Sequence, residues 1–258
     1  MSLWREVVVF AAALTAGAVN SIAGGGTLIS FPTLLWIGRD PILANATNTV
    51  ALWPGAVAGV IGFREELARS KRWLLFLVIP SFIGGVTGAI LLIHTSSHIF
   101  SIIVPYLILG ATILLAAQEV ITRKTRVVAI TEGSHESAVW RIGVYVFQFF
   151  VGVYGGYFGA GIGILMLAAL GLIGLKDTHQ MIGLKNLLAF VVNGIAALYF
   201  ILSGKVIWID VLLMAFASVM GGYFGARMAR RLGRRFVRGF VLFIGFAMTL
   251  SLLLKAHH

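Results

Sequence analysis

Long stretches without a charged residue recur along the whole chain. They cover residues 7–38, 41–63, 73–118 and 142–175. Each stretch is long enough to enter or span a lipid bilayer, which takes about 20 apolar residues in a helix. The pattern therefore predicts an all-α, polytopic helical membrane protein.

Two glycine-rich motifs occur twice, in the same order. The sequence GAVNSIAGGG at 17–26 reappears in looser form as GVYGGYFGAG at 152–161, a shift of 152 − 17 = 135 residues. The sequence GGVTGA at 84–89 reappears as GGYFGA at 221–226, a shift of 221 − 84 = 137. A repeated order at nearly one shift indicates duplication. It predicts a first transmembrane repeat over 1–118, a polar linker over 119–138 and a second repeat over 139–258.

Each predicted repeat begins with one apolar segment that is too long for a single straight helix. The 32 residues of 7–38 would form a helix about 48 Å long, against a hydrocarbon core of about 30 Å. The glycines at 24–26 and 159–163 are the natural break points. A break leaves two possibilities, a re-entrant V and a discontinuous helix. Three ordinary spans follow in each repeat, at 42–63, 73–93 and 99–118, and at 179–203, 207–226 and 239–254.

The positive charges distinguish between topologies. The net charge is +11, but the bases stand at the ends of apolar segments, which indicates membrane topology rather than nucleic-acid binding. If each long segment crosses once, the two sides receive eleven and eight bases. If each returns to its own side, they receive fifteen and four, with Lys185 inside the membrane. The larger bias favours the second arrangement.

That second arrangement makes the two halves inverted repeats, a common design of secondary transporters. Both termini would then be external. The basic stretches 64–72, 123–126 and 227–238 would face the cytoplasm.

The paired glycine breaks are the first candidates for a binding site. A broken helix exposes backbone N–H groups at a new N-terminus, which suits an anion. The alternative is close helix packing at small residues, and for the runs 84–88 and 221–225 packing is the favoured interpretation. The candidate break residues are Gly24, Gly25, Gly26, Gly159, Ala160 and Gly161.

Polar residues near the starts of the following spans form a second group. Asn45, Asn48 and Thr49 share one helical face through their i, i+3, i+4 spacing. Asn186 and Asn193 share another. Such groups usually face the bundle interior or a water-filled cavity, although interhelical hydrogen bonding and capping explain them equally well.

Lys185 is the strongest single candidate for a binding residue, because it is a basic residue inside an apolar run. Burying an unpaired ammonium costs at least about 2.5 kcal/mol, which an anionic ligand or a carboxylate partner would offset. The alternative is snorkelling of the side chain toward the Lys176 side of the membrane.

Other chemistry finds little support in the sequence. The chain has no cysteine, which excludes thiol catalysis and disulfides. No nucleophile triad, pair of catalytic carboxylates, metal motif or cofactor motif is recognisable, so we expect neither an enzyme nor a bound cofactor. His94, His98 and His179 read as interfacial residues, and Asp210 reads as a helix N-terminal carboxylate.

Together these elements resemble the sulfite exporter TauE/SafE family of permeases. The resemblance rests on NSIAGGGT at 20–27 followed by Pro32, ANATN at 44–48, Lys185-Asn186 with Asn193-Gly194, and GGYFGAR at 221–227. It covers nearly the whole chain. Ala160 departs from the glycine-rich pattern, because the equivalent position in the first half is Gly25. All five prolines also lie in the first half. The two halves are therefore expected to contribute unequally to the site.

The resemblance implies a bacterial inner-membrane secondary carrier for small sulfur-containing anions such as sulfite or organosulfonates. It adds Asn20 and Thr27 to the candidate site. The implied partners are the lipid bilayer and the anion, and no nucleic acid; a coupling proton or sodium ion and a homodimer are left open. An anion channel and a carrier of a non-sulfur organic anion are the alternatives.

Overall fold

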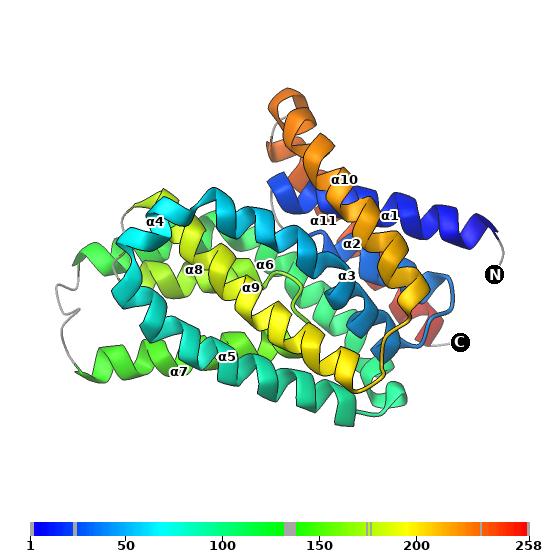
Figure 1. Cartoon of the computed structure of the whole chain (residues 1–258), viewed down its shortest axis with the longest axis horizontal. Coiled ribbons are helices and arrows are strands. Elements are labelled where there is room, and N and C mark those ends of the chain that lie inside the picture. The colour runs from blue at the N-terminus through cyan, green and yellow to red at the C-terminus, as the bar shows by residue number, and fades with distance from the viewer. Residues whose placement is uncertain are drawn as a thin grey trace.

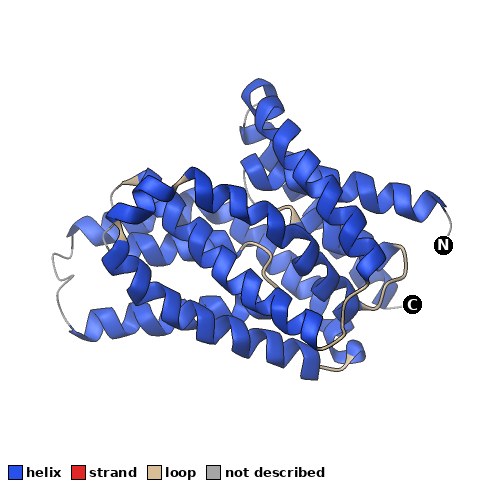
Figure 2. Cartoon of the chain, in the orientation of Figure 1, coloured by secondary structure: helices blue, strands red, loops and turns tan. Residues whose placement is uncertain are grey.

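Helices account for all the regular structure in the described part of the chain (Figure 2). The computed structural model describes residues 3–22, 25–131, 138–173, 175, 177–232 and 234–256. The prediction of an all-α fold is confirmed. The described helices, drawn in Figure 1, are α1 (Leu3–Ile22), α2 (Thr27–Trp36), α3 (Pro41–Gly62), α4 (Arg64–Arg69), α5 (Lys71–His94), α6 (Ser97–Thr131), α7 (Ala138–Tyr157), α8 (Ile162–Leu172), α9 (Thr178–Leu202), α10 (Trp208–Leu232) and α11 (Arg234–Ala256).

The outside of the helix bundle is strongly apolar. Phe243, Leu75 and Phe216 have 72%, 67% and 65% of their surface exposed, and soluble monomers rarely expose contiguous apolar surface on this scale. In the described residues α1, α5, α6 and α9 contain apolar stretches long enough to cross a membrane. These observations confirm a polytopic membrane protein.

Both long apolar segments are interrupted where the glycines predict. The first gives α1 and α2, and the second gives α7 and α8. Gly25 has φ of 92°, and Gly159 and Gly161 have φ of 77° and 74°. These left-handed conformations are readily adopted only by glycine, so the chain turns at these positions.

The first broken segment returns to the end of the molecule where it began. The rings of Trp4, near the start of α1, and Trp36, the last residue of α2, meet edge to face with centroids 5.9 Å apart. Helix α2 has 10 residues, about 15 Å of helix, too short to cross a membrane. The first segment therefore folds back on itself, as a re-entrant V would, and its path through a membrane stays a prediction. The start of α1 and the end of α11 also lie at one end of the molecule, with α4 at the other (Figure 1).

The helix starts repeat with the shifts seen in the sequence. Helices α7 and α8 begin 135 residues after α1 and α2 (138 − 3 and 162 − 27), and α9, α10 and α11 begin 137 residues after α3, α5 and α6 (178 − 41, 208 − 71 and 234 − 97). The equivalent helices α3 and α9 run antiparallel, since Gly183 lies against Phe63 while Gly194 lies against Trp53. Their orientation across a membrane stays a prediction.

Each broken segment packs on a helix of the other half. Helix α1 packs on α10, and α7 packs on α5. Both interfaces use glycine at equivalent positions: Gly17 touches the carbonyl of Ser218 as Gly152 touches that of Ser81, and Gly221 touches Leu14 as Gly84 touches Phe149. A Cβ on any of these glycines would overlap a backbone carbonyl. The packing interpretation of the 84–88 and 221–225 runs is thus the one that the structure supports.

Replacing one of these glycines should separate the helices. In Gly221→Ala the new methyl group meets the carbonyl oxygen of Leu14, so we expect a loss of about 1–3 kcal/mol in the free energy of unfolding. Gly110→Ala is the matched control, because a Cβ at Gly110 meets no atom within 4 Å. It should be neutral or stabilising by up to about 1 kcal/mol. Thermal unfolding of the purified variants measures both, and equal effects would contradict the close-contact explanation.

Candidate functional site

The first break is capped by its own helix. The side-chain Oδ1 of Asn20, in the last turn of α1, accepts a hydrogen bond from the backbone N–H of Gly26 at 2.8 Å. The N–H groups of Leu28, Ile29 and Ser30 donate to carbonyls of Gly25 and Gly26. These four N–H groups are therefore occupied within the break. Thr27 is the first residue of α2, and Gly24 lies outside the described residues.

The second break is held by hydrogen bonds of the same kind. The Tyr154 hydroxyl donates to the carbonyl of Ala160 at 2.7 Å. The N–H groups of Ile162 and Ile164 donate to the carbonyls of Gly159 and Gly161, at 3.3 and 2.9 Å. The turn is thus fixed by local contacts.

One turn of α3 contacts both breaks. Helix α3 begins after Asp40, whose carboxylate accepts from the N–H groups of Ile42 and Leu43. One turn later, the Asn45 Nδ2 donates to the carbonyl of Tyr157, the last residue of α7, at 3.0 Å. The Ser30 hydroxyl of α2 donates to Asn48 Oδ1 at 2.5 Å.

The two broken segments also touch each other beside this turn. Phe31 of α2 and Phe158 of the second break meet edge to face with ring centroids 5.4 Å apart. The neighbouring Thr49 hydroxyl donates to the backbone carbonyl of Asn45 at 2.9 Å. The α3 face predicted from the i, i+3, i+4 spacing therefore lies where the two segments converge.

Helix α9 supplies the second group of candidates and reaches the second break. The Asn193 Oδ1 lies 3.4 Å from the position of a Cβ on Gly159, and the Lys185 stem lies 3.2 Å from a Cβ position on Gly163. Lys185 and Asn186 are half-buried. Eight residues separate Lys185 from Asn193, about 12 Å along a helix. The two candidates therefore lie about two turns apart on α9, Asn193 beside Gly159 and Lys185 beside Gly163.

Asn48 and Lys185 occupy equivalent places in the two halves. Their separation, 185 − 48 = 137, is that of the helix starts, and both helices begin after a capping aspartate, Asp40 and Asp177. Asn48 contacts the short helix α2, and Lys185 contacts the short helix α8. The lysine therefore gives the second half a charge where the first half has a neutral amide.

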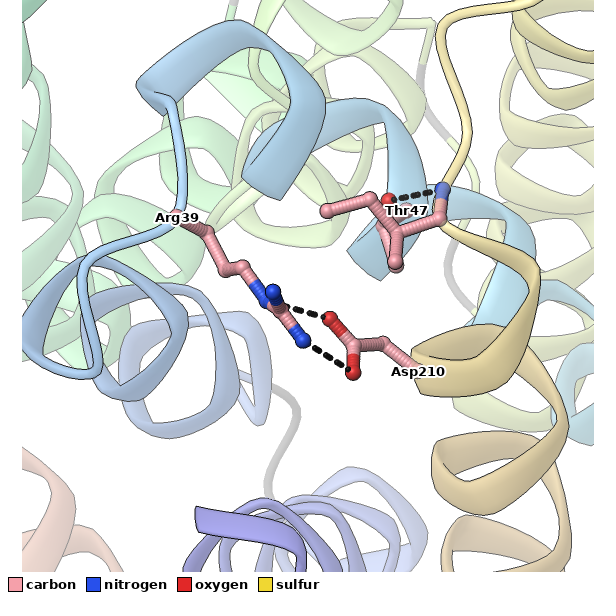
Figure 3. Close-up of polar contacts among 4 residues, drawn as sticks. Arg39, Thr47 and Asp210 are labelled. Carbon is pink, nitrogen blue, oxygen red and sulfur yellow. Dashed lines mark hydrogen bonds and ion pairs between the residues drawn. The ribbon is translucent and has the colours of Figure 1, made fainter. Parts of the chain in front are cut away.

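The structure adds an ion pair that the sequence did not predict. Arg39, between α2 and α3, binds Asp210 in the first turn of α10 through two hydrogen bonds, Nε to Oδ2 at 2.8 Å and Nη2 to Oδ1 at 2.9 Å (Figure 3). Beside it, the Thr47 hydroxyl accepts from the N–H of Ile207 at 3.0 Å. The two contacts tie the first half to the second. Asp210 is at a helix N-terminus, as predicted, but also has this partner.

A pocket of about 450 Å³ opens at the same end of the molecule as Arg39. It is bounded by the start of α3 and by the α5–α6 and α9–α10 turns, and its lining residues are Asp40, Ile42, Leu43, Ile93, Thr95, Ser96, Ser97 and Lys205. The Thr95 and Tyr157 hydroxyl oxygens are 3.4 Å apart. Tyr157 therefore stands between this pocket and Asn45.

Other predictions fall partly outside the described residues. The side chains at 69, 71–72, 122–139 and 224–237 are not described, so the predicted basic cytoplasmic face stays a prediction. Helix α6 extends through Thr131, into the predicted linker. Among the described residues, no group of three histidine, aspartate or glutamate side chains is placed to hold a metal ion.

Comparison with known proteins assigns the family. The model of the sulfite exporter TauE/SafE family matches residues 9–252. A probable membrane transporter protein of Haemophilus influenzae is 29% identical over 246 residues, covering 94% of this chain and 92% of that protein. The probable membrane transporter protein YfcA of Escherichia coli K12 is 28% identical, covering 97% and 90%. The probable membrane transporter protein YunE of Bacillus subtilis is 26% identical, covering 89% of each. No solved structure matches. With the family model covering nearly its whole length, this polytopic helical protein belongs to the sulfite exporter TauE/SafE family of membrane transporters.

Proposed function

We propose that the protein is a secondary carrier of small sulfur-containing anions, such as sulfite or organosulfonates, in a bacterial inner membrane. The anion binds between the two glycine-broken segments, and the halves alternate access to it from the two sides. The basic stretches 64–72, 123–126 and 227–238 face the cytoplasm in this proposal.

The observation that carries the proposal is the convergence of both breaks on one turn of α3. Asn48 contacts the first broken segment through Ser30, and Asn45 contacts the end of α7. Broken helices that meet near the centre of a bundle are the usual substrate site of carriers built from inverted repeats. The antiparallel course of the equivalent helices α3 and α9 supports that architecture.

Charge and hydrogen bonding favour an anion as the cargo. Lys185 places an ammonium group beside α8, and the amides of Asn48, Asn186 and Asn193 lie on the two helices that contact the breaks. Charge-assisted hydrogen bonds to oxyanions are among the strongest that a protein makes. The family name and the names of the relatives, which are probable membrane transporters, agree with an anion permease.

The ion pair at one end suits an alternating mechanism. Arg39 and Asp210 join the two halves beside the pocket lined by Asp40 and Lys205. Their equivalents at the other end would be residues 39 + 137 = 176 and 210 − 137 = 73, and residue 73 is a tryptophan. That place therefore lacks an equivalent of the Asp210 carboxylate, and opening the end that holds Arg39 and Asp210 requires this ion pair to separate.

Selective stabilisation by ligands tests the substrate class. A ligand that binds only the folded protein stabilises it by about 2.7 kcal/mol at 100 times its dissociation constant. We expect sulfite or an organosulfonate to raise the unfolding temperature of the purified protein, with matched carboxylates at equal ionic strength as controls. A shift with carboxylates and none with any sulfur anion would contradict the proposed cargo.

Flux measurements separate a carrier from a channel. In proteoliposomes, uptake of the stabilising anion should saturate with concentration and respond to a proton or sodium gradient. Flux that rises without saturation and ignores both gradients would favour the anion channel.

A further inference from the structure

Asn45 carries a buried oxygen atom with no hydrogen-bond partner. The residue is 1% exposed, and within the described part of the chain its Oδ1 has no partner. A buried polar atom without a partner is costly, and the exceptions in native proteins tend to have a functional reason. The position of this atom, on the α3 turn that contacts both breaks, makes a ligand the natural partner.

The neighbouring contacts decide the chemistry that the ligand must bring. The Asn45 Nδ2 donates to the backbone carbonyl of Tyr157 at 3.0 Å, which a flipped amide could not do. The remaining atom is thus an amide oxygen, which only accepts hydrogen bonds. The nearby hydroxyls of Thr49 and Ser30 donate elsewhere, to Asn45 O and Asn48 Oδ1.

We propose that Asn45 is a specificity-determining residue of the carrier, selecting anions that bear an O–H or N–H group near their sulfur–oxygen head. This inference rests on the proposed function. In this proposal the donor group of the bound anion pairs with Asn45 Oδ1. An anion that lacks this group leaves the oxygen unpartnered, and sites built around a buried hydrogen bond reject such analogues strongly.

The chain offers a matched control in Gln148. This amide is also fully buried, its Nε2 donates to the Ser81 hydroxyl at 2.7 Å, and its Oε1 has no partner in the described part of the chain. It lies at the α5–α7 interface, 157 − 148 = 9 residues before the end of α7. Gln148→Leu therefore removes the same kind of group, with the same kind of packing change, away from the breaks.

The experiment compares two anions of similar shape. Dissociation constants of 2-hydroxyethanesulfonate and propane-1-sulfonate, in which a methyl group replaces the hydroxyl, are measured by calorimetry on the purified full-length protein. We expect the wild-type protein to favour the hydroxylated anion by about 10- to 100-fold. Asn45→Leu should bring the ratio to within about 3-fold by weakening the hydroxylated anion, whereas Gln148→Leu should keep the wild-type ratio.

Several outcomes would overturn this inference alone. A wild-type ratio near one does so whatever the variants show, and so does a preference that survives in Asn45→Leu. If Asn45→Leu does not fold, Asn45→Ala tests the same ratio. Sodium chloride and choline chloride test a cation as the partner of this oxygen. If sodium chloride raises the unfolding temperature of the wild type more than choline chloride does, and Asn45→Leu loses this difference, the oxygen binds a cation instead. Binding of neither sulfonate, together with no response to sulfite, would instead contradict the proposed function.

Discussion

Lys185→Met should nearly abolish anion transport while leaving the protein folded and inserted. The thioether side chain keeps an apolar stem beside Gly163, where the lysine stem lies, but removes the charge. In the proposed complex the half-buried ammonium of Lys185 pairs with the anion, and removing one partner of such a charge pair costs about 2–5 kcal/mol. We therefore expect uptake of the transported sulfur anion to fall by about 100-fold or more. Initial rates in proteoliposomes with equal amounts of protein measure the change.

A second base serves as the control for total charge. Arg5 is exposed on α1, beside the ring of Trp4, and Arg5→Met removes the same charge far from the breaks. Exposed charges contribute little to the stability of the folded protein. Anion uptake by Arg5→Met should therefore stay within about two-fold of the wild type. Unimpaired uptake by Lys185→Met would show that the charge of this lysine does not serve the anion.

Asp210→Ala should strongly destabilise the folded protein. The Asp210 side chain is 2% exposed and its Arg39 partner 19%, and the two join residues 171 positions apart. Removing one partner of a buried ion pair leaves the other charge uncompensated, at about 3–5 kcal/mol. Because Arg39 retains some contact with solvent, we expect a value near the lower end. Thermal unfolding in detergent, calibrated against the wild type, measures it.

The double variant distinguishes the net contribution of the ion pair to stability from the penalty of leaving one charge unpaired. Arg39→Met with Asp210→Leu removes both charges, and such replacements are often neutral or stabilising. We therefore expect the double variant to be more stable than either single variant, Asp210→Leu or Arg39→Met. Additive losses in this cycle would mean that the two charges do not interact energetically.

Spacing and composition predicted the features of the fold that depend on local physics. Apolar runs of span length predicted the helices, and the glycines at 24–26 and 159–163 predicted the breaks, because a left-handed turn inside an apolar run needs glycine. The repeated motifs predicted a shift that the helix starts follow. Helix α4 was missed, since six residues rich in charge resemble a loop.

The candidate site was only partly predictable. The periodicity of Asn45, Asn48 and Thr49 places them on one face, but it cannot show that this face meets both broken segments. Lys185 and Asn193 share helix α9, and only the structure shows that Asn193 lies beside Gly159 and Lys185 beside Gly163. The pair of Arg39 and Asp210 depends on the way that distant segments pack, and neither residue carries a local signal of the other. The importance of Asn45 comes from the different surroundings of its two amide atoms, which no sequence pattern can show.

Each broken segment packs on a helix of the other half, and this arrangement limits the order in which the newly made chain can assemble. Helix α1 presents its glycine surface to α10, which the ribosome synthesises about 200 residues later. Until then the newly inserted first half holds an interface without its partner surface, exposed to lipid or to the insertion machinery. Assembly must therefore finish late, after nearly the whole polypeptide has entered the bilayer. Truncation before α10 should leave a product that quality-control proteases recognise, even though most of its helices are already present.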